Sequence, residues 1–120
     1  MIDNAFATRF VSDWIGAWNA HDLDRILAHY VDDFEMSSPL IADTGAEPTG
    51  TLKGKAAVGT YWGTALGAYP DLRFEHLATF IGVDSVLLQF RWSGGVQAEL
   101  FLFGADGKVE RAYAHHAAER

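Results

Sequence analysis

Residues 72–116 read LRFEHLATFI-GVD-SVLLQFRWS-GG-VQAELFLF-GADG-KVERAYAHH, where hyphens set long segments apart from short, glycine-containing connections. Apolar and polar residues alternate in the long segments, which is the period of a β-strand with two different faces. Short connections that contain glycine favour hairpins between antiparallel neighbours. This part of the chain is therefore predicted to form an antiparallel sheet, with strands over residues 72–81, 85–93, 96–103 and 108–116.

The preceding part has mostly helical periodicity. Large aromatic side chains recur at every fourth residue from Phe6 to Trp18, which places them on one helix face. Residues 40–52 contain glycine and proline and are predicted to form a long irregular loop, a length typical of functional lids or flexible segments. The predicted elements here are a helix over 2–20, a second over about 23–30, a strand over 34–38 and a third helix that begins near Lys55 and ends before Pro70.

This order of elements indicates an α+β fold. Helices that precede a run of antiparallel strands pack together on one face of the sheet. The length of 120 residues predicts a single domain over residues 1–120. We therefore expect three helices packed on a strongly curved, mostly antiparallel sheet.

The composition excludes several classes of function. Without cysteine the chain has no disulfide, no thiolate nucleophile and no cysteine-based metal site. A net charge of −7 disfavours a nucleic-acid partner. No apolar run is long enough for a membrane span, and residues 1–4 do not begin a signal peptide. We therefore expect a cytoplasmic protein with no nucleic-acid or membrane partner.

One acidic residue falls on an apolar strand face. Glu99 shares its face with Phe101 and Phe103. If Phe103 pairs with Lys108 across the turn, Glu99 lies opposite Ala112, where a small side chain leaves space for a pocket. Burial would raise the pKa of this carboxyl and suit it to acid–base chemistry. The structural alternative is a carboxylate at the mouth of the barrel, or one paired with an arginine.

The opposite sheet face is also apolar. Such a surface is too large to leave in water, so it predicts a homodimer through the outer sheet face. Further helical cover over that face is the alternative. The residues that form it are Leu87, Leu100, Leu102 and Tyr113.

Several short stretches resemble a known family. They are WNAHDLD at 18–24, YVDDF at 30–34, SP at 38–39, AYPDL at 68–72 and FGADGKV at 103–109. Together they resemble the nuclear transport factor 2-like superfamily, in its SnoaL-like and ketosteroid isomerase-related branches. The resemblance implies a cone-shaped α+β barrel with a deep apolar pocket, often dimeric through the sheet. It implies little about chemistry, because this fold hosts several kinds of enzymes and binding proteins.

Ketosteroid isomerase is the sharpest comparison within that resemblance. Its base corresponds to Ser38 here, a hydroxyl that cannot take an α-proton at neutral pH. Its phenol donor corresponds to Trp14, whose indole N–H donates but is not acidic. Its carboxylic acid on the penultimate strand corresponds to Glu99. One of the three catalytic elements is therefore retained.

The candidate site residues divide into two groups. Glu99 is the candidate acid or base, and His76 and His116 are candidate proton-exchange partners on apolar strand faces. Each histidine has a structural alternative, as a satisfied core residue for His76 and as part of a mobile chain end for His116. The candidate ligand-binding residues are Trp14, Ser38, Tyr61, Phe90, Phe101 and Ala112. No metal site and no cofactor are expected, because no spacing typical of metal ligands or phosphate loops occurs.

These observations predict a protein that binds a small, mostly apolar organic molecule in an enclosed pocket. Any catalysis would be cofactor-free acid–base chemistry, such as isomerisation, cyclisation, dehydration or hydrolysis. The alternatives are a non-catalytic ligand-binding or dimerisation module of the same fold and an accessory subunit of a larger complex.

Overall fold

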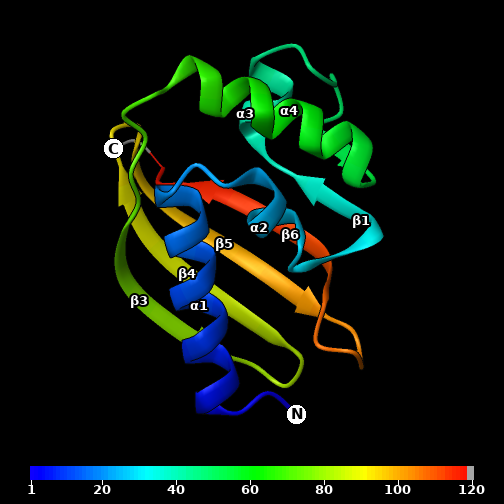
Figure 1. Ribbon diagram of the computed structural model, residues 1–120, viewed down its shortest axis with the longest axis vertical. Helices are drawn as coiled ribbons and strands as arrows, with labels where there is room; N and C mark the ends of the chain where they lie inside the picture. The colour runs from blue at the N-terminus through cyan, green and yellow to red at the C-terminus, as the bar shows by residue number, and fades with distance from the viewer. Residues whose placement is uncertain (119–120) are drawn as a thin grey trace.

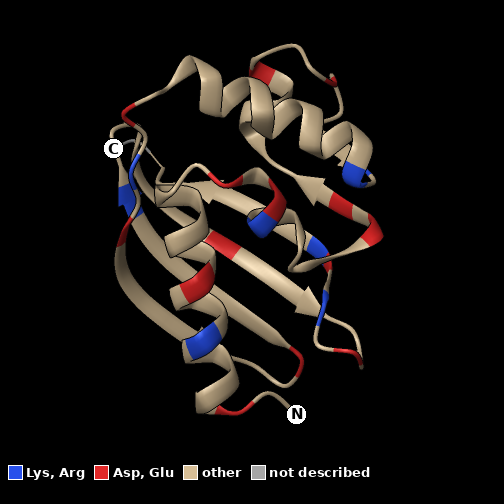
Figure 2. Ribbon diagram, viewed as in Figure 1, with Lys and Arg blue, Asp and Glu red and all other residues tan. Residues whose placement is uncertain are grey.

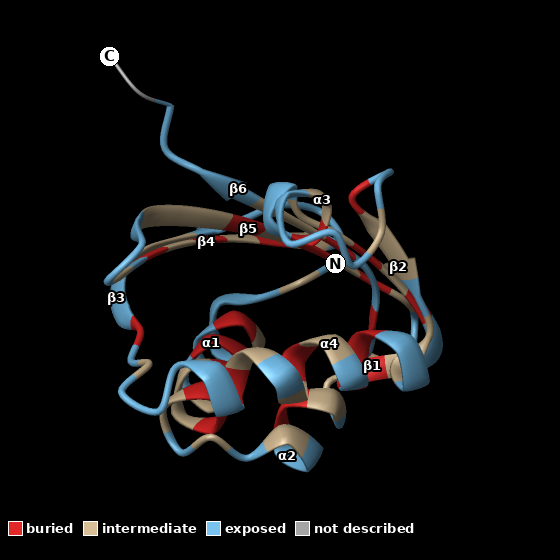
Figure 3. Ribbon diagram, turned by 90° about the horizontal axis from the view of Figure 1, so that it is seen from above, coloured by how far each residue is buried: buried red, intermediate tan, exposed pale blue. Residues whose placement is uncertain are grey.

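The computed structural model describes residues 1–118 and confirms the α+β class. One six-stranded sheet, in the order β2-β1-β6-β5-β4-β3, arches over α1, α2 and α4 (Figures 1 and 3). The sheet is strongly curved but does not close, since β2 and β3 form its two edges. The elements are α1 (Asn4–Asn19), α2 (Leu23–Leu27), β1 (Tyr30–Ser37), α3 (Pro39–Asp43), β2 (Thr51–Lys53), α4 (Lys55–Ala68), β3 (Glu75–Ile81), β4 (Ser85–Trp92), β5 (Gly95–Phe103) and β6 (Val109–His116).

Helix α1 packs its aromatic stripe against the sheet. Asp3 caps the helix by accepting a hydrogen bond from the backbone N–H of Phe6 at 2.8 Å. Trp14 is 1% exposed, and its ring lies 5.2–5.6 Å from the rings of Phe74, Phe90 and Phe101. Helix and sheet are therefore joined through edge and stacked aromatic contacts.

Strand β1 differs from its predicted bounds. It begins at Tyr30, four residues before the predicted start, and α2 ends at Leu27 instead of continuing to residue 30. The reason is a parallel pairing with β6, in which Tyr30 lies opposite Val109. This pairing joins residues far apart in the chain, so local periodicity does not reveal it.

The predicted irregular loop over residues 40–52 is more ordered than expected. Ser38 caps a short helix, α3, and Pro39 occupies its first turn, where the missing N–H is tolerated. The end of the loop returns to β1 as the edge strand β2, with Leu52 opposite Met36. The segment is therefore anchored at both ends.

The register between β5 and β6 also differs from the prediction. Glu99 lies opposite Ala114, and Ala112 lies opposite Phe101. Phe103 pairs with Val109 instead of Lys108, and the register shift between Leu102 and Phe103 adds a second residue. The difference is two residues, so Glu99 keeps the predicted face while its neighbour changes.

The connection that leads into β3 is held by the end of α1. The Asn19 side chain accepts from the backbone N–H of Phe74 at 2.7 Å and donates to its carbonyl at 3.0 Å. Two residues later, His21 hydrogen-bonds the carbonyl oxygen of Leu72 at 2.9 Å. These contacts place Leu72 and Phe74 at the wall of the cavity described below.

We expect the substitution Asn19→Ala to lower the free energy of unfolding by about 1–3 kcal/mol, because it leaves both backbone groups of Phe74 without partners. Urea denaturation measures the change. Thr8→Ala, on the exposed side of the same helix, is the control and should change stability by less than about 0.5 kcal/mol. Equal effects of the two substitutions would contradict the role given to Asn19.

Candidate ligand-binding and acid–base site

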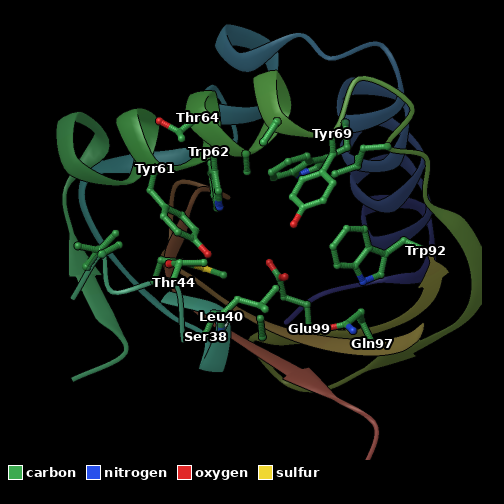
Figure 4. A pocket seen from close by; sticks show the side chains of 18 of the residues that line it. Ser38, Leu40, Thr44, Tyr61, Trp62, Thr64, Tyr69, Trp92, Gln97 and Glu99 are labelled. Atoms are coloured by element: carbon green, nitrogen blue, oxygen red, sulfur yellow. Dashed lines mark hydrogen bonds between the residues drawn. The ribbon is translucent and has the colours of Figure 1, made fainter. Parts of the chain in front are cut away.

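A cavity of about 630 Å³ lies between the helices and the inner face of the sheet (Figure 4). All four tryptophans of the chain line it, together with Tyr61 and Tyr69. This volume falls in the range of small-molecule sites, which are mostly apolar with a few placed polar groups. The tryptophans are Trp14 and Trp18 from α1, Trp62 from α4 and Trp92 from β4.

Glu99 is the buried acid of this cavity. It lies on β5 between Leu88 of β4 and Ala114 of β6, and only 5% of its surface is exposed. Its Oε2 atom is buried and has no hydrogen-bond partner among the residues described. Burial raises the pKa of Glu99 to about 8, since the charged form loses its hydration. At neutral pH the group is therefore mainly a neutral carboxylic acid.

Tyr30 and Trp14 form a hydrogen-bonded pair beside this acid. The indole Nε1 of Trp14 donates to the Tyr30 hydroxyl at 2.9 Å, and both side chains are buried. Burial, with the negative charge of Glu99 as a second cause, raises the pKa of Tyr30 well above its usual value. The Trp14 ring therefore lines the cavity, while its N–H is used within the protein.

A second unpartnered polar atom belongs to Trp18. Its Nε1 is buried and makes no hydrogen bond with the described residues, and its ring also lines the cavity. Buried donors and carboxyls without partners are uncommon, because each costs free energy relative to water. Two such groups on one cavity indicate a place where a ligand or water supplies the missing contacts.

The structure brings together five of the predicted site residues. Glu99, Trp14, Ser38, Tyr61 and Phe90 all line the cavity. Burial raises the pKa of the Tyr61 phenol, and its side chain points into the cavity in Figure 4. The Ser38 hydroxyl accepts from the backbone N–H of Leu40 at 3.2 Å, so it also serves as a helix cap.

The two histidines lie elsewhere. His76 was expected on the buried face of its strand, but it is exposed and hydrogen-bonds Thr79 at 2.7 Å. His76 keeps the predicted face, opposite Phe90 of β4, because the register shift in β3 comes only after it; β3 is an edge strand, however, and the side chain there remains exposed. His116 is opposite Gln97, on the face expected, but it is exposed at the end of β6 and does not line the cavity.

Phe101 and Ala112 were expected at the ligand but belong to the core. Both are fully buried and do not line the cavity. Phe101 packs against the rings of Phe10 and Trp14 instead. The change of register places Ala114, rather than Ala112, at the cavity beside Glu99.

Sequence reasoning assigned no ligand contact to several residues at the cavity. Gln97 lies two residues before Glu99, and Trp92 two residues after Phe90, so the alternation of two already placed each on the cavity face. Trp62 of α4 was not among the predicted site residues, and its ring packs against that of Trp18 at 5.3 Å. Tyr69 lies past the end of α4 and carried no periodic signal.

A separate polar cluster lies on the other side of α1. Asp13 binds Arg25 and accepts from His29, whose Nε2 is 2.7 Å from the carboxylate. The hydrogen bond from Arg25 lowers the pKa of Asp13, whereas burial lowers the pKa of His29. The cluster joins α1 to the segment that leads into β1. Within residues 1–118, no three acidic or histidine side chains converge as metal ligands.

A curved sheet over helices that enclose one aromatic cavity defines the nuclear transport factor 2-like class of folds. The SnoaL-like domain family matches residues 11–118, and the chain belongs to this family. No curated protein matches the chain significantly. Among the helices formed by residues 1–118, none has the length and apolar character of a bilayer span.

Solved structures show the same fold. A SnoaL-like protein of unknown function from Burkholderia thailandensis is 53% identical, covers 98% of each chain and has a TM-score of 0.94. A provisionally assigned polyketide cyclase from Sinorhizobium meliloti is 18% identical over 89% of this chain and 94% of its own, with a TM-score of 0.72. An epoxide hydrolase/cyclase-like enzyme of pyran ring formation in salinomycin is 17% identical over 98% and 95%, with a TM-score of 0.77.

We expect the raised pKa of Glu99 to make stability fall with pH. The native state holds a proton that the unfolded state loses above its ordinary pKa of 4.5, so the contribution is complete below that value and lost as pH rises to about 8. The free energy of unfolding of Glu99→Gln should lack this slope, which is about 1.4 kcal/mol per pH unit. Urea denaturation between pH 5 and pH 9 measures the difference from wild type.

Glu75→Gln removes an exposed carboxyl and is the matched control. It should keep the wild-type slope. If wild type and Glu99→Gln show parallel pH profiles, Glu99 does not carry a raised pKa.

Proposed function

We propose that this SnoaL-like protein binds a small, mostly apolar organic molecule in the cavity and that Glu99 is its acid–base group. The observation that carries this proposal is a buried carboxyl with an unpartnered oxygen among aromatic walls. An acid with a pKa of about 8 can donate a proton at neutral pH and take one after ionisation. Glu99 can therefore act both as a proton donor and as a proton acceptor near neutral pH.

The chemistry available to Glu99 is the activation of an oxygen or an acidic C–H of the ligand. A neutral carboxyl donates to a carbonyl, hydroxyl or epoxide oxygen, and the carboxylate removes a proton from carbon. Isomerisation, cyclisation, dehydration and hydrolysis all use such steps. The fold shared with the cyclase and the epoxide hydrolase/cyclase-like enzyme supports this range.

A non-catalytic binding protein is the second candidate, and Ser38 is the observation that favours it. The resemblance to ketosteroid isomerase assigns the position of the base to Ser38, whose hydroxyl caps α3. Neither of the histidines expected to assist Glu99 lines the cavity. Under this reading Glu99 holds the ligand and moves no proton.

Exchange of the α-protons of 2-tetralone in deuterium oxide, followed by NMR, tests proton transfer directly. We expect wild type to accelerate the exchange and Glu99→Gln to lose at least about 100-fold of the acceleration, because the amide cannot relay a proton. Glu75→Gln should exchange like wild type. Equal exchange rates in wild type and Glu99→Gln would remove Glu99 as the acid–base group, and binding without acceleration supports the second candidate.

The outer face of the sheet suggests that the protein forms a homodimer. Leu87, Leu100 and Tyr113 form one row across β4, β5 and β6 and are each half-buried. The helices α1, α2 and α4 lie on the other side of the sheet, so they do not cover this row (Figure 3). A second copy of the same face would remove this apolar row from water.

We expect light scattering after size exclusion to give a dimer mass for wild type and a monomer mass for Leu100→Arg, because a buried charge without a partner opposes association. Thr8→Arg, on the exposed side of α1, adds the same charge elsewhere and should remain a dimer. A monomeric wild type would contradict the dimer.

A further inference from the structure

The side chains that line the cavity include an acidic group but no basic group. Among its lining residues, all within the described chain, none is lysine, arginine or histidine, and Glu99 is the one carboxyl. An anionic ligand would therefore find no counter-charge and would lie near an acid that is already poorly solvated. The chain as a whole carries a net charge of −7, with acidic side chains spread over helices, strands and loops (Figure 2). Both the cavity and the long-range field disfavour an anion.

The aromatic walls of the cavity favour a positively charged ligand. Trp18 and Trp62 meet at a ring distance of 5.3 Å and an angle of 75°, and Tyr69 and Trp92 meet at 5.9 Å and 87°. Because these rings are steeply inclined to one another, a ligand in the cavity would meet ring faces and ring edges on several sides. The negative face of an aromatic ring attracts a cation, most strongly when water is excluded.

Hydrogen-bond acceptors also reach the cavity. Figure 4 shows the Tyr69 hydroxyl and the Glu99 carboxyl pointing toward one another across it, with the Tyr61 hydroxyl farther along. The unpartnered Oε2 of Glu99 lacks a donor. A primary ammonium group has three N–H donors and no acceptor, so a carboxylate and two hydroxyl oxygens suit it.

We propose that the cavity selects an organic cation, an amine on a mostly apolar body, and that the ammonium group pairs with Glu99 between the aromatic walls. This inference rests on the proposed function of the cavity as a ligand site and names the class of ligand. It is independent of whether Glu99 moves a proton in a reaction.

The proton balance of binding follows from the groups that face Glu99. These are the phenol of Tyr30 from β1, whose pKa the charge of Glu99 raises, and the phenol of Tyr69 after α4; Tyr61 of α4 lies farther along the cavity, beside Thr44. The adjacent positions of β4 and β6 are Leu88 and Ala114. The ammonium enters with its positive charge, the neutral Glu99 carboxyl loses its proton to solvent, and an ion pair remains. Binding therefore releases up to one proton at pH 7 and tightens toward pH 8, until the amine itself loses its proton near pH ~10.

A matched series of probes tests the proposal: 3-phenylpropylamine, 3-phenylpropanol and 3-phenylpropanoate share one apolar body and differ in charge. Isothermal titration at pH 8 measures their affinities. We expect the amine to bind at least about tenfold more tightly than the alcohol, and the carboxylate to bind weakest. Titrations at pH 7 in phosphate and in Tris, which have different ionisation enthalpies, should show proton release with the amine alone.

The variant Glu99→Gln keeps the shape of the side chain and removes its charge. The advantage of the amine over the alcohol should disappear in this variant. Asp33→Asn removes an exposed acidic side chain outside the cavity and should keep the wild-type preference, which separates local pairing from the net charge.

Binding of the alcohol equal to or tighter than that of the amine overturns the proposal, as does an amine that fails to bind. A preference for the alcohol would assign Glu99 and the Trp18 N–H to a carbonyl or hydroxyl ligand instead. In that case Glu99-dependent exchange of 2-tetralone would still support the proposed function, so the two failures are distinguishable.

Discussion

The proposed chemistry of this protein depends on one carboxyl group that the sheet holds out of water. Glu99 lies in the middle of β5, which is paired with β4 and β6 on its two sides, and its buried side chain points into the cavity between the sheet and the helices. Loss of hydration raises its pKa to about 8, with no contribution from a neighbouring charge. Any movement of β5 that opened this position to water would return Glu99 to an ordinary surface acid.

The aromatic residues explain why the cavity persists beside so dense a core. Trp14 occupies the centre, in contact with Phe74, Phe90 and Phe101, and its N–H is satisfied by Tyr30. Trp18, Trp62 and Trp92 line the cavity and do not fill it. Large rigid rings hold their positions with little loss of side-chain freedom, so they wall a space that flexible side chains would fill.

Local patterns predicted most of the elements because each depends on neighbours in the chain. The stripe from Phe6 to Trp18 and the alternation around Phe90 require only helical or strand geometry, and both appear as expected. The same alternation placed Glu99 on the inner face. It also placed His76 on the face of its β4 partner Phe90, but β3 is an edge strand, so the His76 side chain remains in water.

The sequence by itself determined the fold class and the strand face on which an acid would be buried, since periodicity and short turns are properties of adjacent residues. Its short motifs carried the resemblance to the family. Tertiary structure alone decided which residues meet around that acid. The register of β5 against β6 brought Ala114 beside Glu99, and the parallel pairing of β1 with β6 placed Ala112 opposite Met36 in the core. Those contacts join segments that are distant in the chain, and the spacing between such segments does not predict the register in which they pair.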